Sequence, residues 1–558
     1  MQKFFCSKDC PDCCPFSVDE KGNFFYINKI NGFKNFLCIK LKKFYEREVL
    51  TDDYSFIKID NKTVKKNFDE VCKITAQFLK ENADKNILYL RGSGSLGYYM
   101  SYYDLIFQQF ENCYFVDGSL CDETGITAHI EDFGNITNPD IKNLELVDNI
   151  ILFGKNCKVT SPHLYAYLKT LKKKGKKIIY IDPIKSETVK LADKFIRINP
   201  ATDGILVVNI INILQNKQVD KNFEKITNVK TEDLFYLADI FKKGKTGIIT
   251  GMGLQRYTNG KNIINWINHL AVITDNLDYL YFGRSSKESF EKPTVLPKKK
   301  IKIYEISKFL EKGFFDIIVI VAANPLVTHP TSNLWHKALK NSKVIVIDTN
   351  FTETSRFADF FIKVGGMFAQ PDAMGSYFFN FDNFREKPIA TLNNDIDVIK
   401  SLAKHLNINI EIPKISNIPL TKKSLKRVYK KSSAPKLEKP YIETNKFRLI
   451  TCSNYFYLNS QLAENYQKED VCYISISDSL NLNINDGDEI VLQNYLGKVK
   501  VKAKISDKVS AGYIMIYKNR CYDNQPLNLL TKSIPTDSDN AVAIYDTFVE
   551  VKKAYEKI

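Results

Sequence analysis

The sequence lacks any run of 18 apolar residues, so nothing in it predicts a membrane-spanning helix. It also leaves no room for a signal peptide, because MQKFF leads directly into the first cysteine, and we expect neither a secretory nor a twin-arginine leader. We therefore expect a cytoplasmic protein with no direct membrane insertion. In that compartment, thiols bind metals or take part in catalysis more often than they form disulfides.

A concentrated basic patch is also missing, although the formal net charge is +16. The lysines are dispersed, and the one dense stretch, residues 421–440, contains Ser and Pro and is typical of a linker. We interpret the charge as a solvated surface with room for an anionic cofactor. A nucleic-acid partner is not expected.

The pattern of apolar residues divides the chain of 558 residues into several domains. Short apolar strands alternate with helical patterns in the central region, which predicts a parallel, doubly wound α/β sheet. Later segments are short and β-rich with turn signals, which predicts a β-barrel-like module. The predicted divisions are a cysteine-rich segment at 1–60, an α/β region at 61–410, a basic linker at 411–442 and the barrel at 443–558.

The central region contains an internal repeat. Residues 151–162 (ILFGKNCKVTSP) and 319–330 (VIVAANPLVTHP) both place Asn-x-x-Val-Thr-x-Pro after an apolar strand. Downstream, residues 181–198 and 347–364 share Ile-Asp, Glu-Thr, Ala-Asp and Phe-Ile at identical spacing. So many matches in register indicate two copies of one structural unit.

Each copy has the layout of a mononucleotide half-site, at about 140–215 and 310–390. The turn and the helix N-terminus favour phosphate, and the next strand ends in Asp182 or Asp348, placed to bind a ribose or a base. The repeat therefore predicts a doubly wound pair of nucleotide-binding units. In the alternative interpretation, some of the shared polar residues only cap helices or turns: Thr188, Asp193, Thr354 and Asp359.

The densest group of cysteines lies at the N-terminus. Cys6, Cys10 and Cys14 have C-x3-C-x3-C spacing, and Cys38 follows in FLCIK. Four thiolates on a loop-rich segment suit either a [4Fe–4S] cluster or tetrahedral zinc, and the long gap before the fourth cysteine favours the cluster. Cys13 is the alternative third ligand.

This order of a cluster segment, two half-sites and a β-module resembles the molybdopterin oxidoreductases of the dimethyl-sulfoxide-reductase family over essentially the whole chain. In that family two molybdopterin guanine dinucleotides hold one Mo or W. The resemblance implies that Cys6, Cys10, Cys14 and Cys38 ligate the cluster. It also implies that Lys40, two residues after the last cysteine, helps electrons to pass between cluster and pterin.

The same resemblance implies which residues bind the dinucleotides. Glycines are expected where the backbone approaches the pterin and a side chain would block it. The implied residues are Asn156, Thr160, Asp182, Thr202 and Asp203 in the first copy, Asn324, Thr328 and Asp348 in the second, Gly251 and Gly253 in GMGLQR, and Ser460, Gln461, Asn528 and Thr531 in the C-terminal module.

Cys121, in DGSLCDETG, lies where relatives supply a ligand to the metal, and a thiolate is a suitable soft donor. The alternative is a small buried thiol before a helix, with Asp122 as the fallback ligand. Formate dehydrogenases of the family follow this position with His, so Asp122 counts against formate as the substrate.

The sequence also departs from the family's pattern. TDNLDYLYFG (274–283) lacks most of the glycines usual there, and no second cysteine set has cluster spacing. We expect a Mo- or W-dependent oxidoreductase that performs two-electron chemistry, oxygen-atom transfer, on a small molecule, and exchanges electrons with a ferredoxin-like partner. The alternatives are formate as the substrate, or a non-catalytic electron-relay or assembly relative without Mo.

Overall fold

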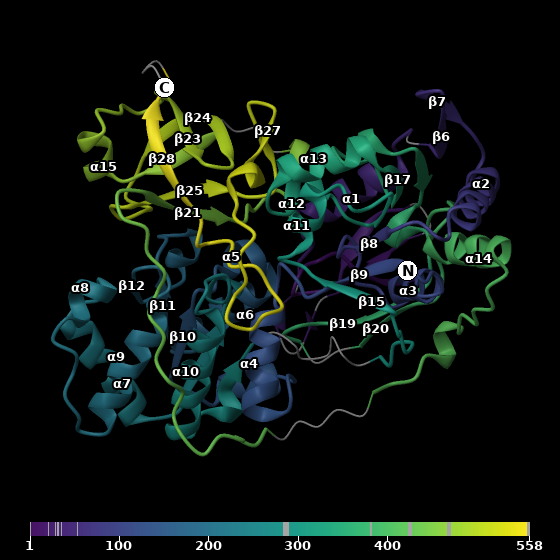
Figure 1. Cartoon of the computed structure of the whole chain (residues 1–558). Coiled ribbons are helices and arrows are strands. Elements are labelled where there is room, and N and C mark those ends of the chain that lie inside the picture. The colour runs from purple at the N-terminus through teal and green to yellow at the C-terminus, as the bar shows by residue number, and fades with distance from the viewer. Residues whose placement is uncertain are drawn as a thin grey trace.

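The computed structural model describes residues 2–19, 22–27, 29–30, 33–34, 36–52, 54–282, 290–379, 382–421, 427–465 and 470–554. Two α/β units and a C-terminal barrel meet around the centre of the molecule (Figure 1). Among the described residues, no helix combines the length and the apolar character needed to cross a bilayer.

The first α/β unit is built on a five-stranded parallel sheet with the order β12-β11-β10-β13-β14. Strands such as NIILF and TGIIT are buried along almost their whole length, as expected where helices cover both faces of a parallel sheet. The strands are β10 Asn149–Phe153, β11 Lys177–Asp182, β12 Lys194–Arg197, β13 Thr246–Thr250 and β14 Leu280–Tyr281. The helices are α4 Glu123–Phe133, α5 Cys157–Thr160, α6 Pro162–Lys173, α7 Asp203–Leu214, α8 Phe223–Thr227, α9 Thr231–Lys243 and α10 Gly260–Ile273.

The second α/β unit has an eight-stranded sheet with the order β15-β9-β8-β16-β17-β18-β6-β7. At one edge, β6 runs antiparallel to β18, and β7 runs antiparallel to β6. The strands are β6 Phe56–Ile59, β7 Lys62–Lys65, β8 Ile87–Arg91, β9 Cys113–Asp117, β15 Lys299–Lys302, β16 Ile317–Val321, β17 Lys343–Asp348 and β18 Phe360–Lys363. The helices are α2 Phe68–Glu81, α3 Tyr102–Phe107, α11 Ile306–Glu311, α12 Pro325–Thr328, α13 Ser332–Asn341 and α14 Asp395–Leu406.

The two sheets reproduce the internal repeat. β10, β11 and β12 are neighbours in the first sheet, and β16, β17 and β18 are neighbours in the second in the same order. The second sheet also takes β8 and β9 from the chain before the first unit, so the first unit is an insertion within the second. The predicted doubly wound α/β pair is confirmed.

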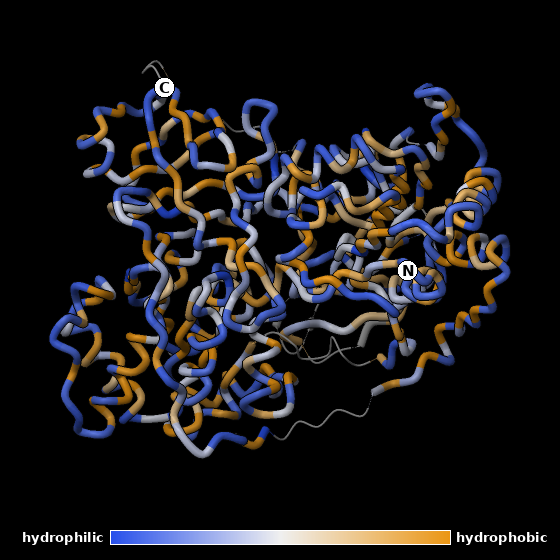
Figure 2. Tube along the Cα trace, viewed as in Figure 1, coloured by the Kyte–Doolittle hydropathy of each residue, from blue (hydrophilic) through white to orange (hydrophobic). Residues whose placement is uncertain are grey.

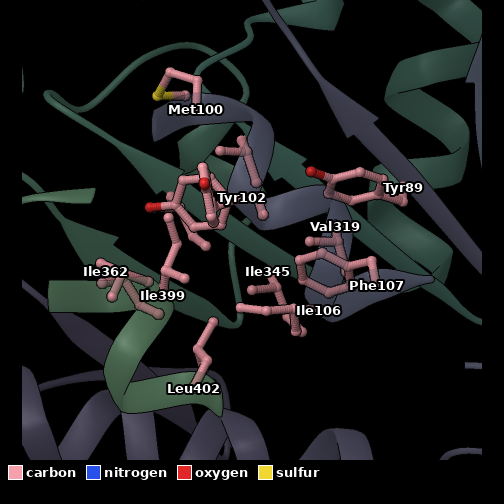
Figure 3. Close-up of a cluster of buried hydrophobic side chains, with 14 of the residues drawn as sticks. Tyr89, Met100, Tyr102, Ile106, Phe107, Val319, Ile345, Ile362, Ile399 and Leu402 are labelled. Atoms are coloured by element: carbon pink, nitrogen blue, oxygen red, sulfur yellow. The ribbon is translucent and has the colours of Figure 1, made fainter. Parts of the chain in front are cut away.

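One part of the core of the second unit lies between its sheet and the helices α2, α3 and α14, and another lies between the sheet and the helices α11 and α13. Ile399 and Leu402 of α14 face Phe107 of α3 and Val319 of β16 (Figure 3). Hydrophobic and hydrophilic residues alternate along outer helices such as α2, where Val71 and the residues one turn away are buried (Figure 2).

The N-terminal segment forms a small antiparallel sheet, with the cysteine loop between its first two strands. Its elements are β1 Gln2–Phe5, β2 Pro15–Val18, β3 Phe24–Tyr26, the hairpin of β4 Lys29–Ile30 and β5 Phe33–Lys34, and α1 Lys40–Val49. A further hairpin joins β19 Asp372–Gly375 to β20 Asp382–Arg385.

The C-terminal module is a closed barrel with the strand order β21-β25-β22-β24-β23-β28, which confirms the predicted barrel. Its elements are β21 Phe447–Cys452, β22 Val471–Ile474, α15 Ile476–Asn481, β23 Glu489–Asn494, β24 Gly497–Ile505, β25 Tyr513–Tyr517, β26 Cys521–Tyr522, β27 Gln525–Pro526 and β28 Phe548–Lys553.

The segment before the barrel contains no helix or strand in its described part, residues 427–446. It lies along the first unit, where the Asn262 side chain donates to the Lys436 carbonyl at 2.7 Å and the Lys430 N–H donates to the Asp132 carbonyl at 2.8 Å. Residues 422–426 of the expected linker, and Gly283 of the glycine-poor stretch, lie outside the described residues.

Candidate functional site

One cavity of about 640 Å³ lies where the two α/β units and the barrel meet. The carboxyl ends of β10 and β16 open into it, which is the position at which parallel sheets bind ligands. Thirteen of the residues expected to bind a cofactor or metal line it: Cys121, Asn156, Thr160, Asp182, Asp203, Gly253, Asn324, Thr328, Asp348, Ser460, Gln461, Asn528 and Thr531.

Two expected cofactor residues do not line this cavity. Thr202 precedes α7, and its hydroxyl donates to the Asn199 carbonyl at 2.7 Å. A Cβ on Gly251 would lie 1.9 Å from the carbonyl oxygen of Gly154, so this glycine allows the ends of β10 and β13 to approach each other. Gly253 has more space, with that carbonyl 3.4 Å from its Cβ position, and it does face the cavity.

The repeated asparagines make the same hydrogen bond in both half-sites. The Thr188 hydroxyl donates to Asn156 Oδ1 at 2.8 Å, and the Thr354 hydroxyl donates to Asn324 Oδ1 at 2.7 Å. Each bond joins the turn after the first strand of the copy to the turn after its second strand. The repeated threonines therefore fix the orientation of the asparagine amides at the cavity.

The repeated aspartates at the third strand hold the sheet itself. Asp193 accepts a hydrogen bond from the Ile178 N–H at 2.8 Å, and Asp359 accepts one from the Val344 N–H at 2.9 Å. For these two residues the alternative interpretation, a structural role in each turn, agrees with the observed contacts.

Two neighbouring carboxyl groups in the first half-site have raised pKa values. Burial raises the pKa of Asp182 to about 6, although the Ile184 N–H and the Tyr180 hydroxyl donate to it at 2.8 and 2.7 Å. Burial and the charge of Asp182 raise the pKa of Asp203 to about 7. Oδ1 of Asp203 is buried and has no hydrogen-bond partner among the described residues, so it can accept a bond from a ligand.

The second half-site presents Asp348 at the end of β17. Loss of hydration raises its pKa, and the nearby charges of Arg47 and Lys8 oppose that effect. The Thr349 N–H donates to Asp348 Oδ1 at 2.6 Å. The second site therefore shares the backbone arrangement of the first, but the charge of its carboxylate, Asp348, is partly compensated by Arg47 and Lys8.

Six of the cations that line the cavity form two contrasting groups. Lys8, Arg47 and Arg91 form ion pairs with Glu48, Glu464 and Asp104, respectively. In the described part of the chain, no carboxylate lies within 4.0 Å of the other group: Lys155, Arg256 and Lys518. Burial and the charge of Arg256 lower the pKa of Lys518 to about 7.

Lys155, Arg256 and Lys518 were not among the site residues expected from the sequence. Lys155 lies inside the repeated motif, but nothing in the sequence showed that it lacks a carboxylate partner. An anionic ligand would compensate these charges. The charges of Cys10 and Cys121 both act on Lys155, which places it near the cysteine loop as well as the cavity.

The four expected cluster cysteines lie together. Burial raises the pKa of Cys14 well above its usual value, and the charges of Cys6, Cys38 and Cys10 raise it further. The Cys13 thiol instead donates to the Cys10 carbonyl at 2.9 Å, with its side chain buried. Over the described residues, no three His, Cys, Asp or Glu side chains converge as ligands of one metal ion.

Cys121 follows β9 in the turn before α4, as expected. Its N–H donates to the Ser119 hydroxyl at 2.9 Å, and its side chain lines the cavity. The charge of Cys121 acts on both Lys155 and Lys518. The Cys121 thiol therefore lies close enough to Lys155 and Lys518 to interact with both ammonium groups.

Lys40 begins α1 and is buried, with its ammonium 5.3 Å from the centre of the Tyr455 ring. Burial and the charge of Cys38 raise the pKa of Tyr455, so this ring lies near both residues. Lys40 is not among the residues that line the cavity. Lys40 therefore lies near Cys38, one of the four expected cluster ligands, and does not face the cavity that Cys121 lines.

Comparisons with known proteins agree with this geometry. Residues 56–362 match the family model described as molybdopterin oxidoreductase, and residues 447–548 match the molybdopterin dinucleotide binding domain. In Bacillus subtilis, probable oxidoreductase YyaE is 24% identical over 78% of this chain and 80% of its own length. Probable oxidoreductase YoaE is 21% identical over 99% of this chain and 98% of its own length.

The solved structure of acetylene hydratase from Pelobacter acetylenicus shares the fold, with a TM-score of 0.78 over 99% of this chain and 100% of that chain. Sequence identity to it is 13%. The assimilatory nitrate reductase catalytic subunit of Bacillus subtilis is 24% identical over 44% of this chain and 43% of its own length. Because the family model matches more than half of its residues, the chain belongs to the molybdopterin oxidoreductases of the dimethyl-sulfoxide-reductase family.

Proposed function

We propose that this oxidoreductase holds two molybdopterin guanine dinucleotides with one Mo or W in its central cavity, and one [4Fe–4S] cluster on its N-terminal cysteines. In this proposal it exchanges two electrons with a small substrate, by oxygen-atom transfer. The supporting observation is the single cavity that joins Cys121 to the polar residues of both copies of the repeat. When bound, the metal and its pterins supply the two-electron chemistry.

The residues around the cavity suit such an anionic, hydrogen-bonding group. Asp203 offers the N–H or O–H groups of a nucleotide a buried oxygen that no described residue contacts by a hydrogen bond. Lys155, Arg256 and Lys518, which lack carboxylate partners in the described structure, suit its phosphates.

Cys121 is the proposed protein ligand to the metal. The Ser119 hydroxyl, which accepts from the Cys121 N–H, fixes the turn, and Lys155 and Lys518 both lie near the thiol.

The proposed cluster ligands are Cys6, Cys10, Cys14 and Cys38. The Cys13 thiol instead donates a hydrogen bond to the backbone of the same loop. Lys40 is proposed to assist electron transfer from its buried position beside Cys38. No second cluster motif occurs in the sequence, so we propose a ferredoxin-like electron partner, and a cytoplasmic site of action.

The test of this function is Cys121→Ala, with Cys521→Ala as a matched control at a half-buried thiol outside the cavity. We expect Cys121→Ala to change the paramagnetic signal of Mo or W and to reduce turnover, while iron and guanine contents stay at the wild-type level. Cys121→Ser should retain part of the activity, because an alkoxide can occupy the same position. An unchanged metal spectrum in Cys121→Ala would remove this residue from the metal and leave Asp122 as the next candidate.

A further inference from the structure

The proposed cluster would be held by two separate segments of chain. Cys6, Cys10 and Cys14 lie on one loop, whereas Cys38 follows the β4–β5 hairpin. In the described structure, no backbone–backbone hydrogen bond joins residues 6–14 to residues 36–38. Something other than β-sheet pairing therefore has to hold the fourth cysteine against the loop.

A single buried imidazole contacts both segments. The backbone N–H of His163 donates to Asp12 Oδ2 at 2.7 Å, and the ring nitrogen Nδ1 lies 3.2 Å from the same oxygen. Its Nε2 lies 3.0 Å from the Phe36 carbonyl oxygen, and the two rings stack 4.4 Å apart with 10° between their planes. Asp12 lies in the cysteine loop, and Phe36 lies two residues before Cys38.

The same histidine belongs to the first half-site. It is the second residue of α6, three residues after Thr160, which lines the cavity. The Cys10 thiol points to the Thr160 carbonyl oxygen at 3.9 Å, so the loop and the half-site also meet directly. Both His163 and Asp12 are almost completely buried, with 1% and 0% exposure.

The second copy of the repeat provides an internal comparison. Thr331 occupies the position that corresponds to His163, and its N–H donates to the Thr531 carbonyl of the barrel at 3.2 Å. The histidine is therefore specific to the copy that faces the cysteines. The repeated fold alone does not require an imidazole at this position.

We propose that His163 is a positioning residue for the [4Fe–4S] cluster: it holds the Cys38 segment against the Cys6–Cys14 loop and fixes both to the first half-site. The inference rests on the proposed cluster. It predicts that the cluster depends on a side chain of the nucleotide-binding unit, far from every cysteine ligand in sequence. A merely structural histidine would affect iron and nucleotide together.

The test compares anaerobically purified wild-type protein with His163→Phe, which keeps ring packing but loses both ring-nitrogen contacts. We expect His163→Phe to release iron to a chelator roughly tenfold faster or more, because a lost hydrogen bond to a charged group changes local equilibria by about that factor. Its cluster reduction potential should shift, while its guanine content stays at the wild-type level. His163→Gln retains an amide donor and should recover part of the wild-type behaviour.

His269→Phe is the matched control, because His269 lies in α10 and contacts Tyr429 rather than the cysteine segments. It should leave iron release and potential unchanged. The inference is overturned if His163→Phe matches wild type in iron release and potential, or if both His163 variants lose iron and guanine nucleotide in parallel. Iron-free wild-type protein would instead refute the proposed cluster itself, which separates the two failures.

Discussion

The carboxyl group of Asp203 should make the cofactor-free protein less stable as pH rises. Its pKa is raised from 3.8 to about 7 in the folded chain. A raised pKa means that the folded state binds the proton more tightly than the unfolded state. The stabilisation is therefore complete below pH 4 and is lost progressively as pH rises to about 7.

The size of the effect follows from the shift. Three pKa units at about 1.4 kcal/mol each give at most about 4 kcal/mol, and Asp203 is only 2% exposed, so solvent screening is weak. Asp203→Asn removes the ionisable group at nearly constant shape. We expect the cofactor-free variant to match wild type near pH 4 and to unfold at a higher temperature at pH 8.

The assay is thermal unfolding of both proteins across pH 4 to 8, alongside Asp193→Asn as a control of opposite sign. Burial alone would raise the pKa of Asp193, but Lys172 and the Ile178 N–H bring it below its usual value. The Asp193 variant should therefore lose stability relative to wild type as pH rises. If Asp203→Asn showed no stabilisation at pH 8, the account of this carboxyl group as a strained ligand-binding acid would be refuted. The same variant should retain less guanine nucleotide after purification.

Two further predictions concern the N-terminal segment. Cys14→Ser should lose the iron cluster, whereas Cys13→Ser should keep it, because the Cys13 thiol forms a hydrogen bond to the backbone instead. Visible absorption and iron content measure both outcomes, and the reverse result would exchange the roles of the two cysteines. Glu48→Gln should lower the free energy of unfolding by about 3–5 kcal/mol, because it leaves the buried Lys8 ammonium without its carboxylate. Denaturant unfolding should show less than about 1 kcal/mol for Glu46→Gln at an exposed pair on the same helix, and equal losses would contradict this explanation.

The internal repeat made much of the fold predictable. Its matched strands became the neighbours β10–β11 and β16–β17, and its matched turns brought Asn156 and Asn324 to the same cavity. The barrel was predictable because its strands are short and regularly separated by turns. Each of these features is local or depends on a repeated spacing.

Other features depend on contacts between distant segments and could not be predicted in this way. β8 and β9 precede the inserted unit in the sequence, whereas the strands that they pair with, β15 and β16, follow it. The periodicity of a strand does not specify such distant neighbours. Lys518 follows β25 and reaches the cavity only because the barrel packs against the two α/β units. Gly251 shows the same limitation, because the need for glycine comes from the Gly154 carbonyl and not from the ligand.

The most direct test of the central claim is the composition of anaerobically purified protein. Metal analysis and acid extraction should give about four iron atoms, one Mo or W, and two guanine nucleotides for each chain, since we propose that each half-site holds one dinucleotide. One guanine nucleotide per Mo or W would contradict the claim that both copies of the repeat bind the cofactor. Protein that contained neither Mo nor W, purified from cells supplied with both, would contradict the proposed catalytic function.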